Sequence, residues 1–282
     1  MRRWKSKEGM RAVFREHGIP CTEGEPYAGA AKARAFAKRH GFPLVFKPEI
    51  GVGAAGAFRV NDDEELNAAL EKGGLEGYVV EKFETGRLTT YDGLTDRDGR
   101  VVFSTSHLYS AGIMDIVNNK LPMHYYNRRE FPDGMEEFGN RIVRAFDLRE
   151  RFFHIELFDL GDGKYRALEV NFRPPGGFTT DLMNYSADVD VYKLWAEIVA
   201  TGSAPEQWKF DRAYHACHVS RRDGVSYKYS HEEALKRLGD ALVLYRRMPD
   251  AFAGAMGNHM YLLRTPDFAE LKKLIAVVEA RT

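Results

Sequence analysis

The sequence predicts an α+β protein that ends in a small α+β unit of its own. Helical and strand-like patterns alternate along all 282 residues without an internal repeat. Asp162-Gly163 gives a strong hairpin signal between two runs of alternating polar and apolar residues. The composition, 44% hydrophobic and 29% charged, is typical of a globular protein with a buried core.

The first part of the chain is predicted to contain helices and short strands around a glycine-rich loop. Glycine and proline end the first helix, and short apolar runs cut by proline or glycine predict strands. Asn61 and Glu64 have the spacing of a capping box. We expect helices over 5–16, 28–40 and 61–70, and strands over 43–47, 58–60 and 78–83.

The second part is predicted to contain longer strands. We expect strands over 88–94, 100–109, 152–159 and 165–171, a helix capped by Asp133 that runs to 146, and a helix over 188–201. The segment 118–132 is expected to be a loop, either a lid or plain surface. Beyond a boundary at 202–206 we expect a strand over 212–220, a helix over 232–238, two short strands and a final helix from Asp267.

Charge and cysteine content exclude several classes of protein. The 41 Lys and Arg residues balance 41 Asp and Glu residues, whereas nucleic-acid binders carry a surplus of positive charge. Cys21 and Cys217 have no metal-binding spacing and fit a reducing compartment. No apolar run is long enough for a signal peptide or a membrane span. We therefore expect a cytoplasmic protein that binds neither nucleic acid nor a membrane.

The predicted hairpin places two carboxylates opposite each other. A two-residue type I′ turn at Asp162-Gly163 pairs Glu156 with Glu169 and His154 with Asn171. The same alternation places an apolar set on the other face: Phe153, Ile155, Leu157, Leu168, Val170 and Phe172. Like charges directly opposite destabilise a sheet, and oxygen ligands of this kind suit Mg²⁺. The alternative is a solvated strand face.

A glycine-rich loop, Gly51 to Ala57, follows the strand that bears Lys47. Gly51, Gly53 and Gly56 would allow the backbone to approach phosphates closely. The loop lacks the Gly-Lys-Ser/Thr of a Walker motif, and a strand rather than a helix follows it. A plain hairpin packed through small residues is the alternative.

Six motifs follow one another along the chain: Lys7 before Gly18-Ile19-Pro20, Phe42 to Pro48, Gly51 to Ala57, Val79 to Phe83, Phe153 to Glu156, and Leu168 to Gly177. In this order they resemble the ATP-grasp superfamily, closest to its carboxylate–amine ligase and biotin-carboxylase-like branch. The resemblance covers about residues 5–202 and implies two α+β subdomains that clasp ATP. We accordingly divide the chain into a leading helix (1–19), an N-terminal subdomain (20–83), a C-terminal subdomain with the metal site (84–205) and a C-terminal unit (206–282).

The resemblance assigns roles position by position. Lys7, Lys47 and the glycines of the loop would bind the ATP phosphates. The adenine would be bound by the carboxylate of Glu81 and by backbone groups of Lys82 and Phe83. One or two Mg²⁺ ions, replaceable by Mn²⁺, would be held by Glu156, Glu169 and Asn171. Arg173 and Lys47 would act on the transferring phosphoryl group, and His154 would lie near the acyl phosphate or be a structural histidine bonded to Asn171.

The sequence also departs from the family pattern. Ser6 stands where an Asp often precedes the first lysine, and Leu88 stands where a ribose-binding Glu is common, with Glu84 as a substitute. The α/β domain that usually precedes the first lysine is not apparent. Three alternatives remain for this domain: it is absent, another subunit supplies it, or the sequence is a trimmed part of a longer chain. A homo-oligomer is a further alternative.

The expected activity is an ATP-dependent carboxylate–amine ligase that acts on small-molecule acids and amines through an acyl phosphate. Two alternatives remain: bicarbonate activation, and a nucleotide-binding subunit without catalysis of its own.

Overall fold

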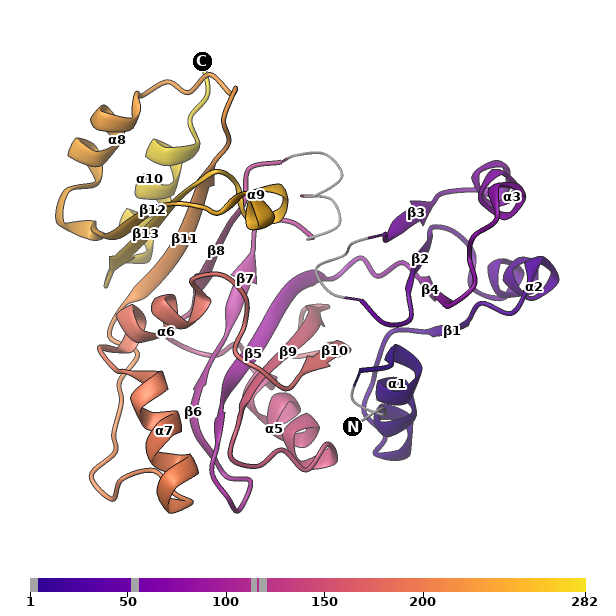
Figure 1. The fold of residues 1–282 in the computed structure, drawn as a ribbon, viewed down its shortest axis with the longest axis horizontal. Coiled ribbons are helices and arrows are strands. Elements are labelled where there is room, and N and C mark those ends of the chain that lie inside the picture. The colour runs from indigo at the N-terminus through magenta and orange to yellow at the C-terminus, as the bar shows by residue number, and fades with distance from the viewer. Residues whose placement is uncertain (1–4, 52–55, 113–115, 117–120) are drawn as a thin grey trace.

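The computed structural model describes residues 5–51, 56–112, 116 and 121–282. These residues form two parts, each built on an antiparallel sheet (Figure 1). The smaller part contains β1 (Gly24–Pro26), α2 (Ala30–His40), β2 (Leu44–Pro48), β3 (Phe58–Val60), α3 (Asp63–Lys72) and β4 (Tyr78–Lys82). Its strands lie in the order β1-β4-β2-β3, and α2 and α3 pack on one core with them.

The larger part is built on a nine-stranded sheet in the order β10-β9-β5-β7-β8-β11-β13-β12, with β6 paired to β5. Its strands are β5 (Arg87–Thr95), β6 (Val101–Thr105), β7 (His107–Tyr109), β8 (His124–Asn127), β9 (Phe152–Asp159), β10 (Tyr165–Asn171), β11 (His215–Arg221), β12 (Leu242–Arg247) and β13 (His259–Thr265). Its helices are α5 (Met135–Ala145), α6 (Thr179–Ala187), α7 (Val191–Thr201), α8 (His231–Leu238), α9 (Asp250–Met256) and α10 (Phe268–Glu279). The strands of the predicted C-terminal unit therefore extend the same sheet.

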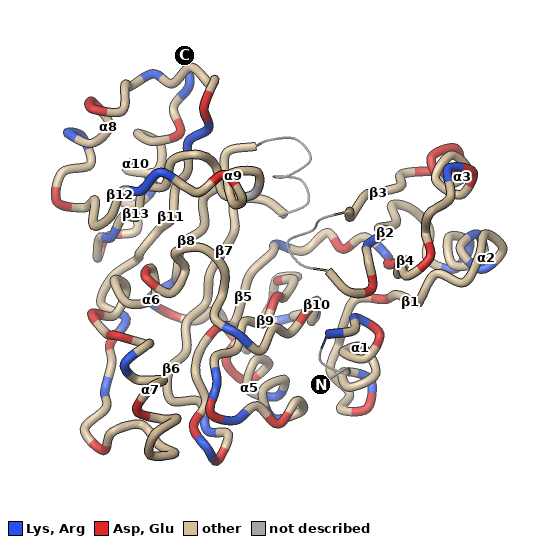
Figure 2. The backbone as a smooth tube through the Cα atoms, viewed as in Figure 1, with Lys and Arg blue, Asp and Glu red and all other residues tan. Residues whose placement is uncertain are grey.

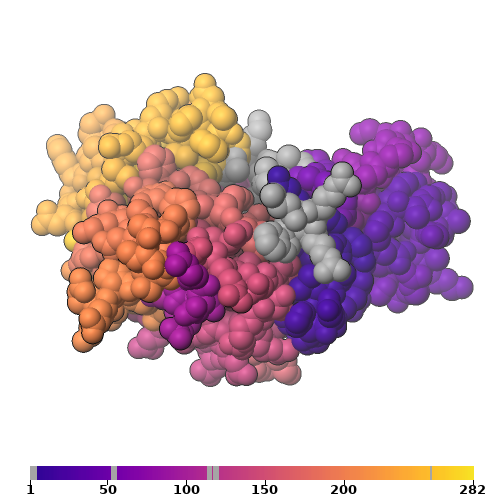
Figure 3. Space-filling view, turned by 60° about the horizontal axis from the view of Figure 1, so that its bottom comes forward, coloured from indigo at the N-terminus to yellow at the C-terminus, as the bar shows by residue number. Residues whose placement is uncertain are grey.

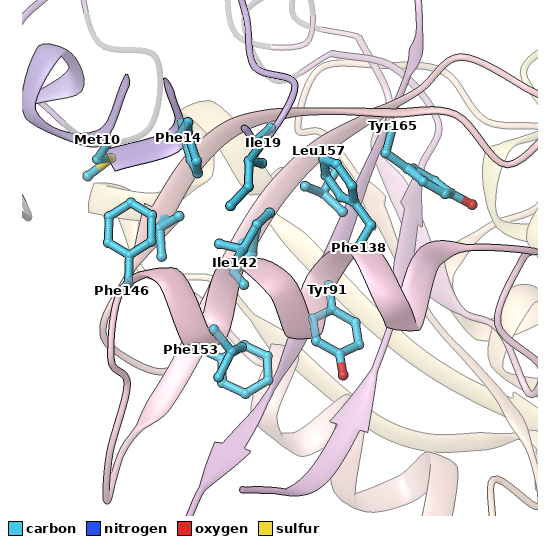
Figure 4. Packing of buried hydrophobic residues seen from close by; sticks show 14 of the residues in the cluster. Met10, Phe14, Ile19, Tyr91, Phe138, Ile142, Phe146, Phe153, Leu157 and Tyr165 are labelled. Atoms are coloured by element: carbon cyan, nitrogen blue, oxygen red, sulfur yellow. The ribbon is translucent and has the colours of Figure 1, made fainter. Parts of the chain in front are cut away.

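The leading helix α1 (Lys7–Glu16) packs against the larger part. Its apolar side chains Met10 and Phe14 enter the core formed by α5, β5, β9 and β10, as Figure 4 shows. The ring of Phe14 meets that of Phe146 edge to face at 5.4 Å. In the space-filling view, the smaller part lies beside the larger one (Figure 3). Because α1 and β10 share a core, Lys7 is brought toward the polar face of the hairpin.

Several boundaries differ from the prediction for identifiable reasons. The cap of α3 is Asp62, whose side chain accepts from the Glu65 N–H, because either of two adjacent polar residues can cap a helix. Gly134 in the left-handed conformation precedes α5, so Asp133 does not cap it. The predicted strand over 100–109 is divided into β6 and β7, and the helix expected over 188–201 begins at Val191 after a separate helix, α6. The expected loop over 118–132 contains β8.

Lys and Arg residues lie among Asp and Glu residues in both parts of the molecule (Figure 2). This mixed distribution agrees with the balance of 41 basic and 41 acidic residues. In the described residues, no helix has both the length and the apolar composition that crossing a membrane requires.

Candidate active site

Ser6 fixes the position of Lys7. The Ser6 hydroxyl oxygen caps α1 by accepting from the Gly9 N–H at 3.0 Å, and the hydroxyl donates to the carboxylate of Glu49. The same carboxylate accepts from the Glu8 N–H at 3.1 Å. Glu49 directly follows β2, two residues before Gly51. The start of α1 is thereby joined to the beginning of the glycine loop, and Ser6 itself caps the helix.

The Glu81 carboxylate is held between two cations. Its Oε2 lies 2.6 Å from Lys47 Nζ, and its Oε1 lies 2.7 Å from Arg11 Nη1. Glu81 and Arg11 are both buried, so each charge depends on the other. The sequence analysis missed Arg11, although it follows Lys7 by four residues and therefore lies on the same face of α1.

The Glu81 carboxylate and the backbone N–H groups of Lys82 and Phe83, which were predicted to contact adenine, have partners within the protein. The Glu81 oxygens accept from Arg11 and Lys47, and the Phe83 N–H donates to Pro43 O at 3.0 Å. The Lys82 N–H donates to Glu23 O at 2.9 Å, while its side chain is exposed. Glu81 thus forms ion pairs with Lys47 and Arg11 in this structure. The assignment of adenine binding to residues 81–83 stays a prediction.

The hairpin brings Glu156 opposite Glu169 and His154 opposite Asn171, as predicted. The turn has Asp162 and Gly163 at φ values of 51° and 68°, and the Lys164 N–H donates to Gly161 O at 2.9 Å. However, Leu160 rather than Gly161 donates to Lys164 O, so the strands first pair one residue out of the predicted register. An irregularity between Ala167 and Glu169 restores the predicted register.

This irregularity corrects the predicted apolar face. Tyr165, Ala167 and Val170 are buried in the core with Phe153, Ile155 and Leu157. Leu168 was expected among them but lies outside that core, because it occupies the position where the register shifts. Phe172 packs against the core as expected.

The two opposed carboxylates influence each other strongly. Burial and the negative charge of Glu156 raise the pKa of Glu169, and the cations Lys7 and Lys47 oppose that rise. Burial alone would raise the pKa of Glu156 too. The hydrogen bond from His154 and the positive charges of His154, Lys47 and Arg173 outweigh burial, so the pKa of Glu156 is lowered. Burial lowers the pKa of Lys7, and Glu169 opposes that shift. The structure thus brings the predicted phosphate lysines to the predicted metal carboxylates.

His154 is oriented by a carboxylate that the sequence analysis missed. Its Nδ1 lies 2.5 Å from Asp92 Oδ1, and its Nε2 lies 3.5 Å from Glu156 Oε1. Asp92 is fully buried and also bonds His107 Nδ1 at 2.7 Å. Burial disfavours a charged His154, but the adjacent Asp92 and Glu156 raise its pKa to about 10. Among the described residues, His154 therefore contacts Asp92 through Nδ1 and Glu156 through Nε2, and not Asn171.

The remaining predicted residues lie at the edges of this site. Arg173 is exposed, and its Nη1 donates to Pro174 O at 2.8 Å. Gly51 and Gly56 flank residues 52–55, so Gly53 falls outside the described residues. Leu88 is buried, whereas Glu84 forms an ion pair with Arg166 at 3.2 Å. Arg166 is thus a further cation on the hairpin itself, one that was not predicted as a site residue.

The donor set fits a divalent cation. Glu156 and Glu169 face each other across the hairpin, and Asn171 lies two residues further along the same face of β10. Burial and the charge of Glu156 raise the pKa of Glu169 despite the opposing charges of Lys7 and Lys47, so a cation bound here would favour the ionised pair. In the described residues no cluster of three or more His, Cys, Asp or Glu could hold a metal ion, so any such site depends on Asn171 or on ligands from outside this set.

Together, the fold and this arrangement define a protein with the ATP-grasp fold. Over its full length the chain resembles the L-amino acid ligase from Bacillus licheniformis, at a TM-score of 0.76 and 17% identity, covering 98% of this chain and 70% of that one. It also resembles carboxyaminoimidazole ribonucleotide synthase from Aspergillus clavatus in complex with ATP, at a TM-score of 0.73 and 18% identity, covering 99% and 74%.

Two comparisons of the amino-acid sequence also find relatives of this chain. Residues 6–103 match the family described as the carbamoyl-phosphate synthase L chain, ATP binding domain. The carbamoyl phosphate synthase large chain of Thermoanaerobacter pseudethanolicus is 24% identical over 201 residues, which are 69% of this chain. The matched region spans only 18% of that relative. The predicted resemblance to the ATP-grasp superfamily is confirmed.

Proposed function

We propose that the protein is an ATP-dependent ligase that joins a small-molecule carboxylate to an amine. The observation that carries this proposal is the meeting of Lys7 and Lys47 with the opposed pair Glu156 and Glu169. Phosphoryl transfer mainly requires positioning and charge neutralisation, and these residues supply both. The similarity in fold to an L-amino acid ligase also supports this proposal.

In the proposed reaction, an oxygen of the substrate carboxylate attacks the γ-phosphorus of ATP, and the bond to the β-γ bridging oxygen breaks to release ADP. Lys7, Lys47 and Arg173 neutralise the phosphate oxygens. Glu156, Glu169 and Asn171 would hold Mg²⁺, which when bound would add positive charge beside the phosphates. The amine then attacks the carbonyl carbon of the acyl phosphate, loses a proton, and inorganic phosphate leaves.

His154 is suited to hold a charge beside the acyl phosphate. Asp92 fixes its ring through Nδ1, while Nε2 points to Glu156. A cation in this position would stabilise negative charge on the transferring group. Asp92 acts through His154 and is a positioning residue.

The proposal is tested by measuring ADP and phosphate release from MgATP with pools of carboxylic acids and amines. Turnover that requires both an acid and an amine, with an amide as product, is expected. Glu169→Gln should abolish it, whereas Glu137→Gln, an exposed carboxylate on α5, should not. Release stimulated by bicarbonate alone would select carboxyphosphate formation instead. Binding of MgATP without turnover in any pool would contradict the ligase proposal.

A further inference from the structure

A cavity lies away from the candidate active site. It has a volume of about 630 Å³ and is bordered by β5, β7, β8, β11 and α10. Cavities of this size accommodate small organic ligands. Its residues all lie within the described part of the chain, and none of them has a role in the proposed ligase reaction.

The strand register places this cavity on the opposite face of the large sheet. Thr90 pairs with Glu156, and both share the face of the candidate metal site. Thr89 pairs with Leu157 and with Leu108, and Leu108 in turn pairs with Tyr126. Because neighbouring residues on a strand point to opposite faces, Leu108 and Tyr126 lie on the far side from Glu156. The two sites are thus separated by the thickness of the sheet.

The floor of the cavity is aromatic. Tyr126, His215 and Phe268 line it, and all three are partly buried. The ring of Phe268 lies 5.2 Å from that of Tyr126 and 5.1 Å from that of His215. This floor offers apolar contact to a planar ring.

The rim of the cavity is basic. Arg87, Arg128, Arg129 and Lys272 line it, against the single carboxylate of Glu130. Arg87 forms an ion pair with Asp159 at 2.8 Å, but within the described residues no carboxylate lies at ion-pair distance from the other three cations. The Arg129 side chain donates to the carbonyl oxygens of Arg212 and Pro266, and Lys272 lies over the ring of Phe268. The rim therefore carries positive charge that the protein does not neutralise.

We propose that this cavity is a second binding site for a small anionic molecule, one that carries a phosphate or carboxylate group on a ring. The ring would lie on Tyr126, His215 and Phe268, and the anion would meet Arg128, Arg129 and Lys272. Charge-assisted hydrogen bonds to the guanidinium groups would fix the orientation of the ligand. The site does not depend on the proposed ligase activity.

The test uses a matched set of probes: 1-naphthyl phosphate, 1-naphthoate, uncharged 1-naphthol and inorganic phosphate. Each is titrated by fluorescence or NMR into the full chain, with and without a saturating non-hydrolysable MgATP analogue. At least one naphthyl anion should bind about tenfold or more tightly than 1-naphthol, in a salt-dependent manner and with the MgATP analogue present. The phosphate and carboxylate arms distinguish the two kinds of anion.

Lys272→Glu should weaken this binding about tenfold or more and leave binding of the MgATP analogue unchanged. Lys273→Glu, an exposed neighbour on α10 that does not line the cavity, is the matched control and should have little effect. Displacement of the probe by the MgATP analogue, equal binding of 1-naphthol, or equal effects of the two lysine variants would overturn the proposal. Binding of an acidic peptide without binding of either naphthyl anion would also overturn it.

Discussion

Glu156 and Glu169 face each other across β9 and β10, although these strands leave their turn in a different register. Burial and the nearby charge of Glu156 raise the pKa of Glu169, so the charged form of Glu169 is disfavoured in the folded protein. Without a divalent cation, Glu169→Gln should therefore increase the free energy of unfolding by on the order of 1 kcal/mol. Thermal unfolding in EDTA measures this gain, and Mg²⁺ should stabilise the wild type more than the variant. A loss of stability in EDTA would contradict the prediction.

The buried ion pair of Arg11 and Glu81 should contribute much more to stability than the exposed pair of Arg15 and Glu8. Arg11→Leu leaves a buried carboxylate with only Lys47 as partner, so we expect a loss of about 3 kcal/mol. Arg15→Leu on the same helix should cost less than about 1 kcal/mol. Urea denaturation of both variants measures the difference, and equal losses would show that Glu81 does not need Arg11.

Ser6→Asp should destabilise the protein, even though Asp caps helices as well as Ser does. The hydroxyl of Ser6 donates to Glu49, and a carboxylate at position 6 would instead repel it. We expect a loss of about 1 kcal/mol and weaker binding of ATP, because Lys7 begins the same helix. The added substitution Glu49→Gln should restore both. If the double variant remains as unstable as Ser6→Asp, the repulsion is not the cause.

Gly139→Ala and Gly254→Ala should have opposite effects, although both glycines lie in helices. A Cβ at 139 would lie 2.2 Å from Tyr91 Cδ1, so the substitution should cost about 1–3 kcal/mol or more through overpacking. A Cβ at 254 meets nothing within 4 Å, so alanine should stabilise α9 by about 0.5–1 kcal/mol. Thermal unfolding of the two variants distinguishes these signs.

Buried His218 should make the protein less stable in acid. Its ring stacks on Tyr125 at 4.8 Å, and neither ring nitrogen has a hydrogen-bond partner among the described residues. Burial lowers its pKa from 6.5 to about 4, so the folded state favours the neutral ring. Stability from this group is present above pH 6.5 and falls toward pH 4, by roughly 3 kcal/mol in total. His218→Phe should flatten this part of the stability profile, and an unchanged slope would assign the loss to other groups.

The sequence predicted which residues share the polar face of the hairpin, but not the register shift between its strands. Alternation with period two placed His154, Glu156, Glu169 and Asn171 together because one face had to be apolar. The register shift around Leu168 could not be predicted, because an apolar residue at that position fits the simple alternation equally well. Helix α6 was missed because Thr179, Thr180 and Ser186 are poor indicators of a helix, and tertiary packing decides their conformation.

Contacts between residues that lie far apart in the sequence could not be predicted from it. Arg11 and Glu81 lie 70 residues apart, and Asp92 and His154 lie 62 apart. Nothing in their local patterns shows that they meet. The arginines at 128 and 129 likewise appear as an isolated surface pair until the sheet brings β8 beside α10.

The placement of α1 has a mechanical consequence. Its apolar side is anchored in the core of the large sheet, while Ser6 and Arg11 contact Glu49, directly after β2, and Glu81 on β4. A rotation of the small sheet away from the hairpin would have to break these contacts or move the helix with it. The helix therefore connects the two parts mechanically, and slow exchange of its backbone amides with deuterium is expected while both sets of contacts are intact.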